Sequence, residues 1–136
     1  MRFFQISPLF WADDKTKAWD EPTRNLALYI LTNPHRNLEG LYRLPYGYIL
    51  EDLDWSPDEV SERMDRLISD GFIAYDEANK VVLIPKAMKF HSPGAPKQLD
   101  GAMNSLAKVP DTPLYSQFLE ACEAYCEPLH KRLTNG

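Results

Sequence analysis

The fold is decided by residues 55–84, which read WSPDEVSERMDRLISDGFIAYDEANKVVLI. Ser56 is a favourable N-cap, Pro57 suits the first helical position, and Glu59 stands three residues after the cap. A serine followed three residues later by glutamate is a capping box, in which each side chain accepts from the backbone of the other residue. This stretch therefore predicts a helix over Ser56–Asp70.

The end of this helix predicts a turn into a hairpin. Gly71 tolerates the left-handed conformation that closes a helix, and Phe72 then falls opposite Leu67, as in a Schellman ending. The apolar runs Phe72–Tyr75 and Val81–Ile84 predict two strands, separated by four residues that favour a turn. A helix followed directly by a hairpin is typical of the second half of a winged helix.

The residues before Trp55 are expected to form the first half of the winged helix. A helix is expected from Asp20 or Glu21 to Asn33, a short strand within Leu38–Arg43, and a helix from Leu44 to about Leu53. The predicted order is helix, strand, helix, helix, strand, strand. We therefore expect a mainly α protein with a small β-hairpin sheet (α+β), namely a winged helix-turn-helix with a helical C-terminal extension.

The domain organisation follows from the prolines after the hairpin. A winged-helix domain is expected over residues 1–91, with residues 1–19 as an N-terminal arm. Residues 92–136 are expected to form a proline-containing linker and a helical extension. Within the extension, helices are expected over Leu99–Ala107 and from Thr112 onward, and Pro128 should kink or end the second one.

Composition limits the functional classes. The 136 residues are 44% hydrophobic and 26% charged, which is typical of an ordinary folded domain. The longest apolar run, Leu26–Leu31, is too short to span a bilayer, and the N-terminus lacks the features of a signal peptide. We expect a cytoplasmic protein with no membrane contact.

The net charge of −5 argues against a general polyanion binder, but the charges are unevenly distributed. Residues 46–77 hold ten acidic and two basic side chains, whereas residues 78–110 hold five lysines and one acid. The basic stretch indicates phosphate contacts from the hairpin turn and the following loop. The residues expected to contact DNA there are Lys80, Lys86, Lys89 and Lys97, with Arg36, Arg43, Arg63 and Arg66 as a second set. An ordinary solvated group of lysines is the alternative interpretation.

The helix over residues 56–70 is poorly suited to a major groove. It carries five acidic side chains and only two basic ones, Arg63 and Arg66. Carboxylates repel a phosphate backbone, so such a helix binds DNA weakly. A structural or protein-contacting helix is the favoured interpretation of this segment.

Aromatic residues are numerous in the first 48 positions. The residues proposed for self-association are Phe3, Phe4, Phe10 and Trp11, because an apolar arm either docks on its own domain or crosses to a neighbouring subunit. Trp19, Tyr42, Tyr46 and Tyr48 add to the aromatic side chains that are able to stack on single-stranded bases, although a role in the core is favoured for most of them.

Catalytic and metal-binding patterns are missing from the sequence. It contains no glycine-rich phosphate loop, no His-Glu-x-x-His and no Gly-x-Ser-x-Gly motif. Cys122, Cys126 and His130 recur every fourth residue, but zinc sites usually draw a second ligand pair from another element. We expect no enzyme, no catalytic residue, no metal and no cofactor.

Several motifs resemble a known family. The run Pro34–Pro45, the later Trp55-Ser56-Pro57 and Asp70-Gly71-Phe72-Ile73, and the segment Val81–Phe90 resemble the N-terminal winged-helix domain of phage replisome-organiser and DnaD-like replication proteins. The resemblance covers about residues 1–91. It implies DNA binding, self-association and a role in replication initiation, with the replicative helicase or its loader as a partner. A second domain of longer family members carries a Tyr-x-x-x-Ile-x-x-x-Trp motif, and no tryptophan follows Trp55 here.

The leading hypothesis is therefore a DNA-binding, self-associating module of a phage or prophage replication initiation protein. A winged helix that binds proteins, with little DNA contact, is the second hypothesis. A transcriptional regulator with the same fold is the third.

Overall fold

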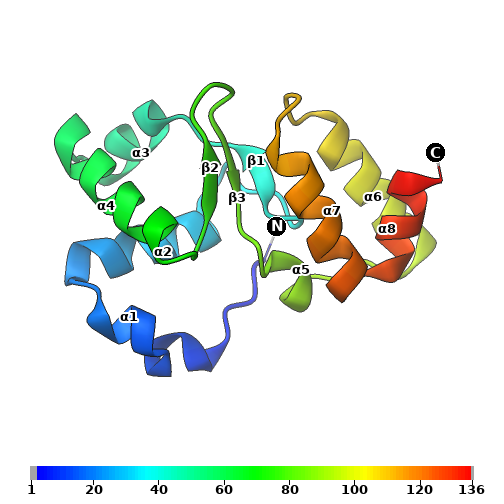
Figure 1. The fold of residues 1–136 in the computed structure, drawn as a ribbon, viewed down its shortest axis with the longest axis horizontal. Helices are drawn as coiled ribbons and strands as arrows, with labels where there is room; N and C mark the ends of the chain where they lie inside the picture. Colours follow the sequence, from blue (N-terminus) through cyan, green and yellow to red (C-terminus); the bar gives the residue numbers. More distant parts are fainter. Residues whose placement is uncertain (1–2, 136) are drawn as a thin grey trace.

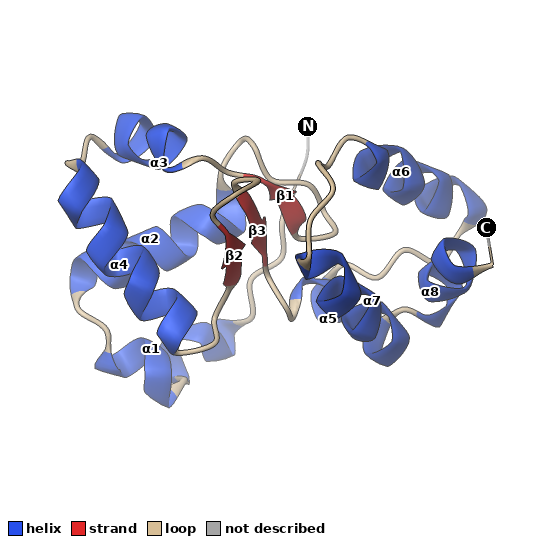
Figure 2. Ribbon diagram, turned by 45° about the horizontal axis from the view of Figure 1, so that its top comes forward, coloured by secondary structure: helices blue, strands red, loops and turns tan. Residues whose placement is uncertain are grey.

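The computed structural model describes residues 3–135, and the chain is mainly helical with a small antiparallel sheet near its middle (Figure 1). In chain order the elements are the 3-10 helix η1 (Pro8–Ala12), α1 (Asp14–Ala18), α2 (Glu21–Thr32), β1 (Leu41–Arg43), α3 (Tyr46–Leu53), α4 (Pro57–Ser69), β2 (Ala74–Asp76), β3 (Val81–Leu83), α5 (Ala87–Phe90), α6 (Pro96–Ala107), α7 (Leu114–Tyr125) and α8 (Glu127–Thr134). Helices α1 to α4 lie on one side of the sheet, and α6 to α8 lie on the other (Figure 2). Among the helices of residues 3–135, none has both the length and the apolar character needed to span a bilayer.

The sheet has three strands in the order β1–β3–β2, and both pairs are antiparallel. Leu41 in β1 and Ala74 in β2 lie opposite the same residue of the central strand, Leu83. The predicted order of helix, strand, helix, helix, strand, strand is present as α2, β1, α3, α4, β2 and β3.

Helix α4 begins and ends as its sequence predicts. The Ser56 hydroxyl accepts from the N–H of Glu59 at 3.2 Å, and the Glu59 carboxylate accepts from the N–H of Ser56 at 3.3 Å. At the other end, the N–H of Phe72 donates to the Leu67 carbonyl at 3.0 Å, and Gly71 has a φ of 76°. The capping box and the Schellman ending are both confirmed.

One face of the sheet completes a core with α2, α3 and α4. Successive strand residues point to opposite faces, so Tyr42 and its cross-strand neighbour Val82 share this side. The buried side chains of this first core are Trp19, Leu26, Ala27, Ile30, Tyr42, Leu44, Ile49, Val60, Met64, Leu67, Ile73, Val82, Ile84 and Ala87.

The opposite face of the sheet is covered as well. Leu41, Val81 and Leu83 point to this side, and each is at most 1% exposed. The buried side chains packed with them are Met88, Leu99, Ala102, Phe118, Cys122, Cys126 and Leu129. The helices after residue 92, expected as an extension, thus share a second core with the sheet.

The strand expected within Leu38–Arg43 is confined to its last three residues. Gly40 has a φ of 76°, which takes it out of the extended region. The Asn37 side chain accepts from the N–H of Gly40 at 2.9 Å and donates to the Leu41 carbonyl at 2.7 Å. These bonds close a turn just before β1.

Other boundaries differ from the expected ones for local reasons. Strand β2 covers Ala74–Asp76 rather than residues 72–75, because Phe72 belongs to the cap of α4. Helix α6 begins at Pro96, three residues before the predicted start. Pro128 lies in the first turn of α8, where no intrahelical N–H is needed, and α7 ends before it.

Candidate nucleic-acid interface

The four lysines expected to contact DNA are exposed, and β3 separates them. Lys80 precedes β3 in the hairpin turn, whereas Lys86 and Lys89 follow the strand, just before and within α5 (Figure 1). Lys97 lies in the first turn of α6. The expected basic stretch is therefore divided between the two ends of the central strand.

Arg36 lies in the interior of the protein. It is 1% exposed, and burial lowers the pKa of its guanidinium. Its Nε donates to the Asn37 carbonyl at 3.1 Å, and its Nη1 donates to the Leu31 carbonyl at 2.6 Å. The guanidinium also lies 4.5 Å from the centroid of the Phe4 ring. Arg36 thus holds the loop between α2 and β1, and its side chain does not lie at the protein surface.

The two arginines of α4 are engaged within or beside their own helix. The Nε of Arg66 donates to the Asp70 carboxylate at 2.8 Å. Arg63 donates to the Glu59 carbonyl at 3.2 Å, and its guanidinium lies 5.1 Å from the centroid of the Trp55 ring. The exposed acidic side chains of α4 are Asp58, Glu59, Glu62 and Asp65. The negative charge on the outer face of this helix would repel a phosphate backbone.

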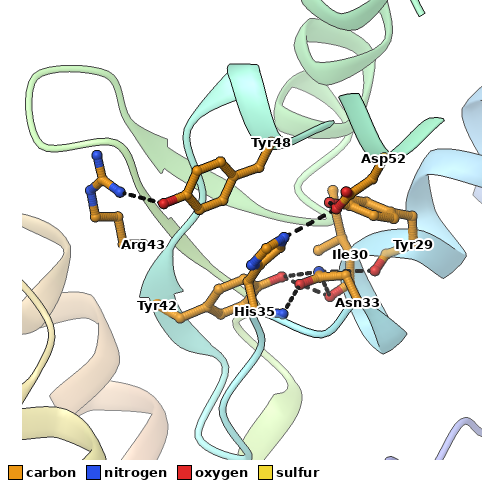
Figure 3. Close-up of polar contacts among 8 residues, drawn as sticks. All are labelled: Tyr29, Ile30, Asn33, His35, Tyr42, Arg43, Tyr48 and Asp52. Atoms are coloured by element: carbon orange, nitrogen blue, oxygen red, sulfur yellow. Dashed lines mark hydrogen bonds and ion pairs between the residues drawn. The ribbon is translucent and has the colours of Figure 1, made fainter. Parts of the chain in front are cut away.

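Arg43 and Lys80 lie at the same end of the sheet. Arg43 is the last residue of β1, opposite Val81, and the N–H of Leu44 donates to the Lys80 carbonyl at 2.8 Å. The Nη1 of Arg43 donates to the hydroxyl of Tyr48 on α3 at 3.0 Å (Figure 3). The Arg43 guanidinium is thereby held next to an exposed aromatic ring, and the backbone of Lys80 lies at the same end of the sheet.

His35, from the loop after α2, packs against the ring of Tyr48. The ring centroids are 4.6 Å apart and the planes are inclined by 35° (Figure 3). The Nε2 of His35 lies 3.1 Å from Oδ2 of Asp52, which also accepts a 2.6 Å hydrogen bond from the Tyr29 hydroxyl. The bond from Tyr29, followed by that from His35, lowers the pKa of Asp52. Asp52 therefore anchors the imidazole beside Tyr48.

Asn33 fixes the loop that carries His35. Its Nδ2 donates to the Tyr42 hydroxyl at 2.9 Å and to the Tyr29 carbonyl at 3.0 Å, while its Oδ1 accepts from the N–H of His35 at 2.9 Å. The Tyr42 hydroxyl in turn donates to the Ile30 carbonyl at 2.8 Å, and burial raises the pKa of Tyr42. A buried network with these partners makes the position of His35 well defined (Figure 3).

We call the exposed side chains of His35, Arg43, Tyr48 and Lys80 the Arg43–Tyr48 surface. Sequence reasoning named Arg43 and Lys80 as DNA contacts but did not name His35. One signal was present, because Tyr48 and Asp52 are four residues apart and therefore share one face of α3. The approach of His35 depends on the loop that Asn33 holds after α2, and no comparable signal for this contact is present in the sequence.

A second surface, between α3 and the hairpin, is acidic and aromatic. The rings of Tyr46 and Tyr75 are 5.0 Å apart and inclined by 34°. Burial and the nearby charges of Asp65 and Glu77 raise the pKa of Tyr46 to about 12. Within the part of the chain that the structure describes, its buried hydroxyl has no hydrogen-bond partner.

The N-terminal arm is divided between packed and exposed aromatic residues. Phe10 packs edge-on against Trp11 and Phe72, with ring centroids 5.1 and 6.5 Å apart, and Phe4 lies edge-on to the His91 ring. By contrast, Phe3 is 75% and Trp11 56% exposed. The exposed part of the arm is therefore apolar at Phe3 and Trp11.

The two thiols are buried in the second core. Burial raises the pKa of Cys122 to about 12, and the Sγ of Cys126 lies 3.1 Å from the Pro93 carbonyl. Over residues 3–135, no group of three or more His, Cys, Asp and Glu side chains is arranged to hold a metal ion.

No family model, curated protein or solved structure matches this chain.

Proposed function

We propose that this chain is a winged-helix DNA-binding module of a phage or prophage replication initiation (replisome organiser) protein, with the replicative helicase or its loader as a partner. The order of α2, β1, α3, α4, β2 and β3 and the antiparallel sheet support the winged helix. The resemblance of residues 1–91 to the N-terminal domain of DnaD-like proteins supports the replication role.

The observation that carries DNA binding is the meeting of Arg43 and Lys80 at one end of the sheet. In this proposal their side chains contact phosphates, while the acidic outer face of α4 stays out of the major groove. Binding through phosphates is largely independent of sequence and falls steeply as salt is added. A transcriptional regulator would need α4 to enter the major groove and contact base edges. The carboxylates of α4 would be repelled by the phosphates that line the groove.

The test measures the fluorescence anisotropy of labelled duplex and single-stranded DNA at about 50 and 200 mM salt. The double variant Arg43→Glu/Lys80→Glu should lower the affinity at least about tenfold, since two phosphate contacts become repulsive. The matched control is Lys86→Glu/Lys89→Glu, which makes the same change in net charge at the other end of β3.

The outcomes separate a site from a general charge effect. A larger loss for the Arg43/Lys80 variant supports contact at that end of the sheet. An equal loss in both variants assigns binding to overall charge or to both ends, and a larger loss in the control moves the contact to α5. Absence of binding by the wild-type protein at low salt contradicts a DNA-binding function.

A protein-binding winged helix is the second candidate, and the acidic and aromatic surface between α3 and the hairpin favours it. Paired aromatic rings with Asp65 and Glu77 beside them are complementary to a basic, partly apolar segment of another protein.

This second function has its own measurement. A lysine-rich peptide containing leucine should shift NMR signals of α4 and the hairpin, and Asp65→Lys/Glu77→Lys should abolish the shifts. Equal shifts in the variant and in the wild-type protein would contradict a docking role for this surface.

Self-association through the arm is a further part of the proposal. Phe3, Leu9 and Trp11 are more than half exposed, and burying such side chains between two copies is favourable by about 1.5–3 kcal/mol each. Light scattering over a range of concentrations should give a dimer or larger species, and Leu9→Ser/Trp11→Ser should shift it toward the monomer. A wild-type chain that stays monomeric at high concentration would overturn this part.

A further inference from the structure

Tyr48 differs from the other aromatic residues that the sequence offers for base stacking. Tyr42 is buried, and Tyr46 packs on Tyr75 beside carboxylates. Tyr48 is 37% exposed, and its hydroxyl accepts from the Arg43 guanidinium. An exposed ring next to a cation is the arrangement by which proteins bind unpaired bases.

The ring of Tyr48 is held in position before any ligand binds. Arg43 contacts its hydroxyl at 3.0 Å, and His35 packs against the ring at 4.6 Å between centroids (Figure 3). His35 is itself fixed through its backbone by Asn33 and through Nε2 by Asp52. A ring with few accessible rotamers loses little conformational entropy on binding, which favours its use as a platform.

The exposed ring of Tyr48 suits a single strand better than a duplex. In a duplex the faces of the bases are covered by their neighbours, so a flat ring gains no stacking contact there. In a single strand a base face is accessible, and stacking on an aromatic side chain is tolerant of sequence. Lys80, whose backbone lies beside that of Leu44, adds a second cation for the phosphates that flank the stacked base.

We propose that the Arg43–Tyr48 surface binds single-stranded DNA by stacking one unpaired base on Tyr48, with Arg43 and Lys80 on the adjacent phosphates. This inference rests on the proposed DNA-binding function and gives its substrate class. It assigns base stacking to Tyr48 and the positioning of that ring to His35, and a count of positive charges along the sequence would reveal neither role.

The experiment uses the full chain and a labelled oligo-dT containing one 2-aminopurine, whose fluorescence falls when it stacks. The test variant is Tyr48→Leu, which keeps an apolar side chain but removes the ring. The matched control is Phe90→Leu, because Phe90 is also 40% exposed and has the Lys89 ammonium 5.8 Å from its ring centroid. Circular dichroism and urea unfolding verify that both variants remain folded.

We expect wild-type protein to quench the 2-aminopurine and to bind the single strand more tightly than a duplex of the same length. Tyr48→Leu should abolish the quenching and weaken single-strand binding by roughly tenfold. Its duplex affinity should change less than twofold, and Phe90→Leu should behave as wild type.

The failures of the two proposals are distinguishable. If the wild-type protein binds neither form of DNA, the proposed function fails and this inference fails with it. If it binds DNA but Tyr48→Leu binds the single strand as tightly and quenches as strongly as wild type, the stacking site is overturned while the DNA-binding function stands. A Phe90→Leu variant that loses the quenching instead also overturns it.

Discussion

The hydroxyl of Thr112 donates a 2.7 Å hydrogen bond to the carboxylate of Asp76, and this bond joins the hairpin turn to the loop before α7. Asp76 also accepts a 2.7 Å hydrogen bond from the side chain of Asn79, within the turn itself. Both hydrogen bonds lower the pKa of Asp76, and the bond from Asn79 has the larger effect. The hairpin that carries Lys80 is thereby tethered to the helices on the far side of the sheet.

Thr112→Val should loosen this tether while keeping the shape of the side chain. The pKa of Asp76 should rise toward its ordinary 3.8, and the urea midpoint should fall at pH 7. A carboxylate whose pKa is lowered by folding stabilises the protein above its unfolded-state pKa, and this stabilisation is lost as the pH falls through the folded-state pKa. The difference in urea midpoint between the variant and the wild type should therefore shrink at about pH 2. Thr134→Val is the control, since that hydroxyl donates to the His130 carbonyl within its own helix. An equal difference at both pH values would argue against the ionised Asp76 as the cause.

Deleting the residues after His91 should destabilise residues 3–91 rather than release them as an intact folded unit. Leu41, Val81 and Leu83 would lose the cover of α7, and leaving such side chains in water costs about 1.5–3 kcal/mol each. That sum is a large share of the ~5–15 kcal/mol by which domains are typically stable. The truncated chain should bind the dye ANS and lose its sharp melting transition. A fragment with the melting temperature of the full chain and no dye binding would refute the shared core.

Gly40→Ala should lower the free energy of unfolding by about 2 kcal/mol or more. The residue has a φ of 76°, and a Cβ there would lie 2.4 Å from the Cβ of Ala87. The control is Gly101→Ala, inside α6, where a Cβ meets nothing within 4 Å. That substitution should stabilise the chain by roughly 0.5–1 kcal/mol, because alanine is the better helix former. Urea unfolding of both variants should therefore give changes of opposite sign.

The attachment of the arm should depend on pH through His91. The N–H of Gln5 donates to its Nε2 at 2.9 Å, which requires a neutral imidazole. Burial, followed by the charge of Arg36, lowers the pKa of His91 from 6.5. Because the pKa of His91 is lower in the folded protein, the stabilisation by the Gln5–His91 hydrogen bond is complete above about pH 6.5. It is lost as the pH falls through the pKa of His91 in the folded protein. Protection of the Gln5 amide from hydrogen exchange, measured by NMR and corrected for the intrinsic rate, should therefore fall between about pH 7.5 and 5.

The control for the arm is His91→Gln, whose side-chain oxygen accepts a hydrogen bond but does not titrate in this range. Its Gln5 amide should show protection that is independent of pH. The same pH dependence in both proteins would assign the effect to another group.

The parts of the fold that are determined locally could be predicted from the sequence. The ends of α4 depend on Ser56, Glu59 and Gly71, all within a few residues of the backbone groups that they satisfy. The cover on the second face of the sheet was not predicted, although Val81–Ile84 is apolar at every position. Such a run is typical of a strand buried on both faces, whereas the prediction treats it as one half of a hairpin.

The candidate site was harder to predict, because it depends on contacts between segments distant in the sequence. Arg36 resembles a surface cation by residue type, but it is buried, and two backbone carbonyls and the Phe4 ring contact its guanidinium. His35 reaches Tyr48 only because the loop bends at Asn33. Neither arrangement follows from spacing or charge along the chain.

The central strand β3 has a neighbour on each edge and a helical layer on each face. Strand β1 and helix α5 also contribute side chains to both cores, and β3 is the strand at the centre of this shared sheet. We expect the amides of β3 to exchange only through global unfolding, and the calorimetric and van't Hoff enthalpies of melting to agree. A chain that the sequence divides near residue 91 should thus behave as one cooperative unit.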